Sequence, residues 1–175
     1  MEYNVAGLLK APHGEMRHHE VDEEPSFALI GARLTGHIVG SVGLMRTQQG
    51  VLVQADLQVE AEVTCARCLR PAHTVLAVHI SEEFRPSVDI RTGMRLWPEP
   101  DEFIEDELFL DEHHVLHLDE VVRQELEASI PIKPLCRPDC AGLCPHCGAD
   151  LNEEQCQCAQ PIDVRWEALR QLLHN

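Results

Sequence analysis

The sequence predicts an α+β fold in which an antiparallel β-rich domain with one helix precedes a small cysteine-rich segment. Three observations lead to this prediction. Apolar and polar residues alternate strictly along residues 51–63, apolar residues recur at helical spacing along residues 118–130, and six of the eight cysteines lie between Cys136 and Cys158.

The length of 175 residues suits one domain with a small addition. An apolar fraction of 44% can fill a core, and the aromatic content of 4% means that Val, Leu, Ile and Ala must do so. We expect residues 1–135 to form the β-rich domain, residues 136–160 the cysteine-rich segment, and residues 161–175 a C-terminal amphipathic helix.

The first expected elements are two strands, at residues 27–34 and 37–45, that pair with each other through a turn at Thr35-Gly36. Gln48-Gln49-Gly50 then turns the chain into a long strand that begins at Val51. In that strand one side chain in two is apolar, which is the period of a half-buried strand.

A second strand follows with Leu76, Val78, Ile80 and Phe84 in one phase, so the two runs predict a hairpin. Its tip is CARCLRP, which places Cys65 and Cys68 in the turn. The next segment, residues 86–101, is rich in turn-forming residues and is expected to be a loop.

Apolar residues at 118–130 predict a helix behind Asp119 and Glu120, two carboxylates that suit a helix N-terminus. Pro131 and Pro134 end it just before the cysteine-rich segment. A second, C-terminal helix is expected from the spacing of Ile162, Trp166, Leu169 and Leu173, with Asp163 as its cap.

The first 24 residues have neither a basic stretch nor a long apolar stretch, so we expect no secretory signal and a compartment that keeps thiols reduced. There, paired cysteines indicate a metal site before they indicate disulfides. CPHCG presents two thiolates on one tight turn, and Cys156-Gln157-Cys158 presents two more on one face of an extended segment. Cys144, Cys147, Cys156 and Cys158 are therefore predicted to bind one zinc ion.

The other four cysteines, Cys65, Cys68, Cys136 and Cys140, would form a second zinc site if the fold brings the hairpin tip to the segment after the helix. Eight cysteines make two tetrads with none left over, which favours two zinc ions over one. One zinc site with four free thiols, disulfides, or another metal are the alternatives.

Two cysteine patterns that would indicate redox or catalytic chemistry are weaker than the pattern of zinc ligands. Cys140, Cys144 and Cys147 have the C-x3-C-x2-C spacing of radical S-adenosylmethionine enzymes, but the chain is too short for their barrel. The CARC motif bridges two strands here, whereas a thioredoxin-like motif opens a helix. His113, His114 and His117 match no HExxH motif and are expected to be surface or structural residues.

The sequence contains no nucleophile–base pair, phosphate-binding glycine loop or nucleotide fingerprint, so we expect no enzyme and no small-molecule substrate. No apolar run is long enough to cross a membrane.

The net charge of −16 argues against a broad electrostatic contact with nucleic acid. Residues 101–120 hold nine carboxylates and no Lys or Arg, as in a solvated face or a docking surface for a basic partner.

With these residues in view, the chain resembles the YceD family of large ribosomal RNA subunit accumulation proteins over nearly its whole length. The resemblance rests on NVAGLLKAPHGEMRHHEVD, VTCARCLRP, IPIKPLC, DCAGLCPHCGADLNEEQCQC and a tail of the type WEALRQLL. It implies a bacterial or plastid ribosome-biogenesis factor with a zinc-binding tail and no catalytic residue, located in the bacterial cytoplasm.

Two mechanisms fit that implied role. In the first, which the acidic charge favours, the face at residues 101–120 holds a basic ribosomal protein of the large subunit. In the second, the protein contacts ribosomal RNA through a local basic patch. That patch consists of Arg67, Arg70, Lys133 and Arg137.

Overall fold

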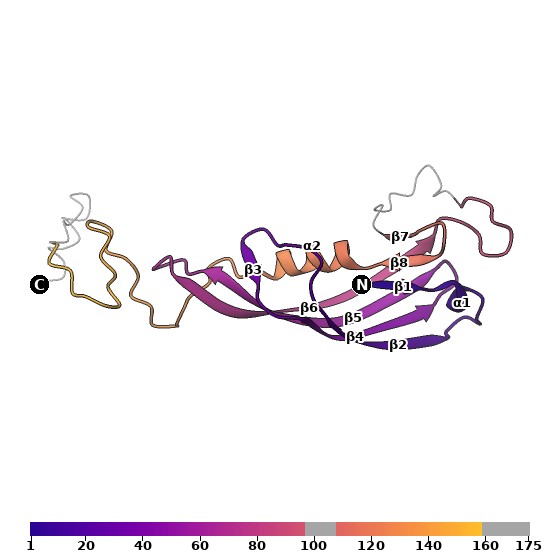
Figure 1. Ribbon diagram of the computed structural model, residues 1–175, viewed down its shortest axis with the longest axis horizontal. Helices are drawn as coiled ribbons and strands as arrows, with labels where there is room; N and C mark the ends of the chain where they lie inside the picture. Colours follow the sequence, from indigo (N-terminus) through magenta and orange to yellow (C-terminus); the bar gives the residue numbers. More distant parts are fainter. Residues whose placement is uncertain (97–107, 159–175) are drawn as a thin grey trace, which may run out of the picture.

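The computed structural model describes residues 1–96 and 108–158, and its largest element is a long, mainly antiparallel sheet (Figure 1). Its strands run in the order β2-β4-β5-β6-β7, and β3 also pairs with β5. A two-stranded sheet, β1-β8, lies beside it. The elements are β1 (Glu2–Asn4), α1 (Ala6–Leu9), β2 (Met16–Glu23), β3 (Ala32–Leu34), β4 (Ile38–Arg46), β5 (Val51–Thr64), β6 (Pro71–Pro86), β7 (Phe109–Leu110), β8 (Val115–His117) and α2 (Asp119–Ser129). The predicted α+β class is confirmed.

The β5–β6 hairpin is the central pair of the sheet, and its strands pair without interruption from Val51 opposite Phe84 to Thr64 opposite Pro71. Every odd-numbered residue of β5 is buried, whereas most even-numbered residues are exposed. The alternation in the sequence therefore predicted both the strand and the side of it that faces the core. The hairpin also carries Cys65 and Cys68 at its tip, as expected.

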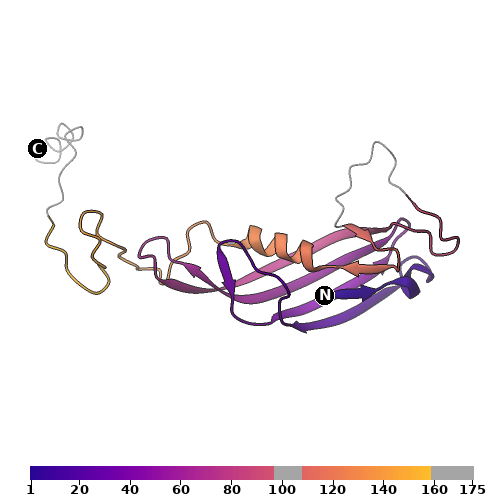
Figure 2. The same cartoon turned by 45° about the horizontal axis from the view of Figure 1, so that its top comes forward.

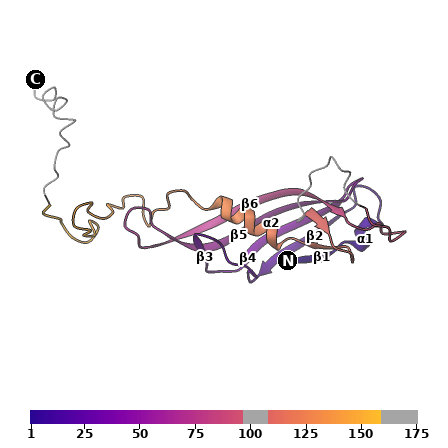
Figure 3. The same ribbon diagram turned by 90° about the horizontal axis from the view of Figure 1, so that it is seen from above.

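One face of the sheet, here called the inner face, is covered by α2, by the β1-β8 pair and by α1 (Figures 1 and 3). Val122 and Leu126 of α2, Leu8 of α1 and Leu116 of β8 are fully buried in one core with the inner side chains of β5. The opposite, outer face carries no covering element among the described residues. The sheet is therefore one layer of a two-layer fold.

The predicted pairing of residues 27–34 with 37–45 is wrong. Of residues 27–34, only Ala32–Leu34 form a strand. This strand, β3, pairs with Ala61–Val63 of β5 rather than with β4. The reason is the length of β5: β4 pairs only with Val51–Gln58, which leaves the tip half of β5 open on that side. Because β3 fills this open stretch, β3 and β4 lie end to end along β5.

The strand β2 has no clear signal in the sequence. Its residues MRHHEVDE are almost all charged or polar, and Val21 is its one buried side chain. It pairs with β4 over eight residues at the edge of the sheet. Charged side chains are usual on edge strands, because they discourage pairing with a further strand. With polar residues on both sides of β2, its sequence lacks the alternation of apolar and polar residues that would have identified it as a strand.

The helix predicted at residues 118–130 is confirmed as α2, which begins at Asp119 and ends before Pro131. The described part of the expected loop, up to residue 96, contains only an isolated bridge between Val88 and Arg95. The helix expected at 161–175 lies outside the described residues. None of the described helices is long and apolar enough to cross a membrane.

Gly40 lies opposite Leu57 in the β4–β5 pairing, and its backbone adopts a φ of +152°. A Cβ atom there would lie 2.0 Å from the carbonyl oxygen of Asp56. Gly40→Ala should therefore force the two strands apart and lower the free energy of unfolding by about 2 kcal/mol, which is about 6 °C in melting temperature.

Gly43→Ala on the same strand is the matched control for this prediction. A Cβ atom at Gly43 would meet its nearest neighbour, the ring of His18, at 3.4 Å, and its φ is not positive. This variant should melt within about 2 °C of the wild type. Equal melting shifts for the two variants, measured by circular dichroism, would contradict the close-approach argument.

Candidate metal centres

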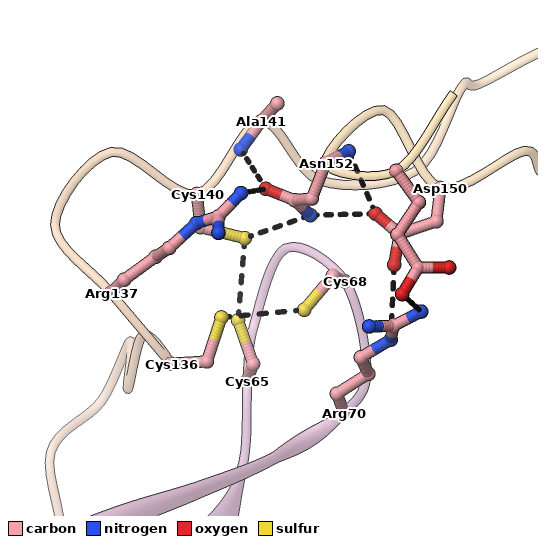
Figure 4. Close-up of polar contacts among 10 residues, drawn as sticks. Cys65, Cys68, Arg70, Cys136, Arg137, Cys140, Ala141, Asp150 and Asn152 are labelled. Carbon is pink, nitrogen blue, oxygen red and sulfur yellow. Dashed lines mark hydrogen bonds and ion pairs between the residues drawn. The ribbon is translucent and has the colours of Figure 1, made fainter. Parts of the chain in front are cut away.

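The first cluster of cysteines joins the hairpin tip to the segment that follows α2 (Figure 4). Cys65 and Cys68 come from the tip, where the N–H of Leu69 donates to the carbonyl of Cys65 and closes the turn. Cys136 and Cys140 come from the chain after Pro134, whose carbonyl accepts a hydrogen bond from Ala66 in the tip. Two segments almost 70 residues apart are thus brought together at one end of the molecule.

The sulfur atoms of this first cluster lie at distances suited to a metal. The Sγ atoms of Cys65 and Cys140 are 3.9 Å apart, those of Cys68 and Cys136 are 3.6 Å apart, and all four lie within 4.8 Å of one another. A zinc ion with four Zn–S bonds of about 2.3 Å requires edges of about 3.8 Å between sulfurs in a tetrahedron. The four thiols therefore fit a tetrathiolate centre.

Burial distinguishes this first cluster. Cys65 is fully buried, Cys68 and Cys140 are nearly so, and only Cys136 is exposed. Val63 packs against these thiols in a small apolar cluster that is separate from the main core. The tip of the hairpin therefore has little apolar packing of its own, and the cysteines lie where a second core would otherwise be needed.

The second cluster is local in sequence and lies beyond the hairpin tip, in the orange and yellow segment of Figure 2. Its members are Cys144, Cys147, Cys156 and Cys158. The sulfur of Cys156 lies 3.4 Å from that of Cys147 and 3.3 Å from that of Cys144, and the four again lie within 4.8 Å of one another. These four thiols also fit a tetrathiolate centre.

The CPHCG turn positions the first pair of this second cluster. The N–H of Gly148 donates to the carbonyl of Cys144 at 2.9 Å, and the φ of Gly148 is +75°, which suits a glycine. The backbone N–H of His146 points at the sulfur of Cys144 at 3.4 Å, while its own side chain is not a ligand candidate. Of the four cysteines, only Cys144 is buried.

The pKa values within each cluster are pushed apart. In the first cluster the pKa of Cys65 falls to about 6, because the backbone N–H groups of Cys68 and Cys136 point at its sulfur. Although Cys136 is exposed as a residue, its pKa rises to about 12, because the protein around its sulfur displaces water and because the neighbouring thiols disfavour a further charge. In the second cluster, backbone N–H groups lower the pKa of Cys144 to about 6 and neighbouring thiols raise that of Cys158 to about 12. Only a bound cation would let all four thiols of a cluster ionise together.

Asn152 fixes the chain around the first cluster, as Figure 4 shows. Its Nδ2 donates to the sulfur of Cys140 at 3.6 Å and to Asp150 at 2.6 Å. Its Oδ1 accepts from the backbone of Ala141 at 2.8 Å and from Arg137 at 2.7 Å. Since Asn152 lies between the two cysteine pairs of the second cluster, one side chain connects both clusters.

Arginines of the predicted RNA-binding patch make contacts inside the molecule. Arg70 pairs with Asp150 at 3.0 Å and with Glu153 at 2.6 Å. Arg67 donates to the carbonyl of Cys140 at 2.7 Å. The contacts of Arg67 and Arg70 hold the cysteine-rich segment against the hairpin tip, whereas the Arg137–Asn152 hydrogen bond lies within that segment. The sequence indicated a basic patch here, because the sequence alone does not show which acidic side chains and carbonyl groups lie beside these arginines.

The acidic run at residues 101–120 is divided by the structure. Residues 101–107, which include Glu102, Glu105, Asp106 and Glu107, lie outside the described part. The other four carboxylates make contacts within the molecule: Asp111 with His117, Glu112 with Arg95, Asp119 with Ser26 and the N-terminal ammonium, and Glu120 with Arg123. The four described carboxylates of the run therefore have partners within the molecule.

The weaker interpretations of the cysteines and histidines find no support in this geometry. Cys140 belongs to the first cluster, whereas Cys144 and Cys147 belong to the second, so C-x3-C-x2-C is not one site. CARC remains a turn between two strands. His114 is buried in a turn near β8, and its carbonyl accepts the N–H of Val5, as expected of a structural residue.

Comparison with known proteins points to one family. A family model described as "Large ribosomal RNA subunit accumulation protein YceD" matches residues 53–173, which include both cysteine clusters. Uncharacterized proteins of Mycobacterium bovis and Mycobacterium tuberculosis are each 29% identical to this chain, over 99% of its length and 81% of theirs.

An uncharacterized protein of Mycobacterium leprae is 26% identical over 85% of this chain and 67% of its own length. No solved structure matches the chain. Because the family model covers more than half of the chain, from inside the long strand to beyond the last cysteine, this protein belongs to the YceD family.

Proposed function

We propose that this protein is a non-enzymatic factor in biogenesis of the large ribosomal subunit, which is organised by zinc and acts by binding a basic ribosomal protein. The family description supports the first part, since it names accumulation of large-subunit ribosomal RNA. The observation that carries the molecular part is the pair of four-cysteine clusters in a strongly acidic chain. On this proposal the protein acts in the bacterial cytoplasm, where ribosomal subunits are assembled.

Zinc is the metal that these clusters suit best. Four thiolates in a tetrahedron are a usual ligand set for structural Zn²⁺, and soft sulfur ligands exclude Mg²⁺ and Ca²⁺. Cys65, Cys68, Cys136 and Cys140 would hold one ion, and the second cluster would hold the other. Four protein ligands leave no position for water or substrate, so zinc would supply a cross-link between chain segments rather than catalysis.

The charge of the protein favours a protein partner over RNA. Two occupied sites would take the formal charge from −16 to −20, because eight thiolates outweigh two dications by four charges. Unassisted binding to a polyanion would then be repelled at long range. The alternative RNA-binding patch is also weaker than expected, since Arg67, Arg70 and Arg137 already have partners within the chain.

A pull-down from bacterial lysate, with and without ribonuclease, tests this proposal. The tagged protein should retain a basic large-subunit ribosomal protein after complete digestion of RNA, and binding should weaken as salt rises because charge steers the association. The bait for the control is an unrelated acidic protein of similar size and net charge. A partner that both baits retain does not count as specific.

Two results would contradict the proposal. Loss of every ribosomal partner on ribonuclease treatment would favour the RNA mechanism through Arg67, Arg70, Lys133 and Arg137. Retention of no large-subunit component under either condition would remove the link to ribosome assembly, whatever metal the protein holds.

A further inference from the structure

The outer face of the sheet is uncovered along its whole described length. The strand register places the outward side chains of β2, β4, β5 and β6 on this one surface, with Glu20 opposite Ser41, Ser41 opposite Asp56, and Asp56 opposite His79. The inner face, by contrast, carries α2, α1 and the β1-β8 pair (Figure 1). A sheet that is covered on one side only presents a broad, firmly held surface on the other.

This outer face has a strongly unequal charge. Six carboxylates point outward from its strands, whereas the two guanidinium groups in the same alternation, Arg33 and Arg85, lie toward its opposite ends. Arg33 is itself paired with Glu62 at 3.0 Å. No lysine lies on any of these strands. The six carboxylates belong to Glu20, Asp22, Asp56, Glu60, Glu62 and Glu83.

A shallow hollow of about 470 Å³ lies in the middle of the outer face. The apolar side chains of Val39 and Ala77 line it together with Asp56 and His79, and the strand register places all four on the outer face. Asp56 meets the Nδ1 atom of His79 at 2.8 Å, yet its side chain is 76% exposed. The aliphatic stem of a lysine or arginine could lie on the apolar part while its charged head reaches Asp56.

We propose that this outer face is the docking surface for a lysine- and arginine-rich segment of a protein partner. The charge complementarity selects this occupant: a nucleic acid or an anionic lipid surface would be repelled, and a second copy would bring two carboxylate-rich faces together. That the partner is a ribosomal protein rests on the proposed function. That the surface binds a basic segment rests only on the charge and shape of the outer face. The outer face is thus a second candidate acidic contact beside residues 101–120.

The test uses the full-length, metal-loaded protein and a 16-residue synthetic peptide in which lysine and alanine alternate, at 150 mM salt. Amide chemical shifts in the wild-type protein map the contact without any substitution. They should change along β4, β5 and β6 and around the Asp56 hollow. Changes confined to residues 101–120 or to the cysteine clusters would overturn the proposal.

Two triple variants of equal charge change separate local docking from net charge. The face variant is Glu20→Gln, Asp56→Asn and Glu60→Gln, and it should bind the peptide at least about tenfold more weakly. The control variant is Glu15→Gln, Glu125→Gln and Glu154→Gln, which neutralises three exposed carboxylates away from the face. It should bind within about threefold of the wild type, because it removes only screened, long-range attraction. Equal weakening by both variants would overturn the proposal.

Self-association is the remaining competing occupant. Sedimentation equilibrium that shows a dimer in the wild type and a monomer in the face variant would mean that the face binds a second copy, which overturns the proposal. The experiments distinguish failure of the proposed function from failure of the docking site. If the pull-down finds no ribosomal protein but the peptide binds the face, only the function fails. If the pull-down finds one and the face variant retains it as well as the control does, only the docking site fails.

Discussion

Replacing Cys68 by serine should remove one of two zinc ions per chain and lower the free energy of unfolding by at least about 4 kcal/mol. The first cluster closes a loop of 68 residues between Cys68 and Cys136, and it stands in for a hydrophobic core at the hairpin tip. Metal bound there would contribute directly to folding, since the ligands come together only in the folded chain. Elemental analysis and thermal unfolding of the wild type and the variant measure the two effects.

Cys147→Ser is the matched comparison, because it removes one ligand from the second cluster. That cluster closes a loop of only nine residues between Cys147 and Cys156. Since the entropy of loop closure grows with the logarithm of loop length, the loss of stability should be smaller by about 2 kcal/mol. Each variant should keep about one zinc ion per chain.

Three outcomes would count against this account of the clusters. Loss of both ions from either variant would mean that the two sites share ligands. Equal melting shifts would contradict the ranking by loop length and burial. Wild-type protein without metal, in which thiol titration finds four disulfides, would end the metal interpretation altogether.

Asn152→Ala should weaken metal binding at the first cluster by about 10- to 100-fold, although Asn152 is not itself a ligand. Groups that hydrogen-bond to metal ligands commonly have effects of this size, because they hold the ligand in place and stabilise its charge. Here the substitution removes the N–H that points at the Cys140 sulfur and the acceptor for the Ala141 backbone. Competition with a chromophoric zinc chelator measures the change site by site in a Cys147→Ser background.

Glu154→Ala is the control for that measurement. Glu154 is exposed and close in sequence to Asn152, and its side chain makes no contact with either cluster among the described residues. It should leave both affinities within about twofold of the wild type. Unchanged affinity in Asn152→Ala would mean that the contact at 3.6 Å does not support the ligand.

The two proposed features lie in different parts of one hairpin. The clusters fasten its tip, and the docking face occupies the outer side of its strands. Zinc at the first cluster would therefore support the register of β5 and β6, on which the alignment of Asp56 with His79 depends. Loss of metal should disturb the tip first, while the central sheet keeps its own core.

Local patterns in the sequence were enough to predict several parts of this structure. The alternation from Val51 onward identified β5 and its buried side, and the spacing behind Asp119 identified α2. The turn chemistry of CARC and CPHC, together with an even count of cysteines, predicted which four sulfurs gather in each cluster. These signals are readable because a period of two, a period of 3.6 and a tight turn each involve neighbouring residues.

Contacts between distant segments were decided only by the tertiary structure. The strand β3 pairs with β5 because β4 leaves the tip half of that strand open, and β2 is a strand because it borders β4. Arg70 has an acidic partner within the chain because Asp150, 80 residues away in the sequence, lies beside it. The acidic outer face arose in the same way, since carboxylates on three separate strands share one surface only once the register is set. A sequence pattern reports what each segment can bury, whereas pairing depends on which segments compete for the same edge or face.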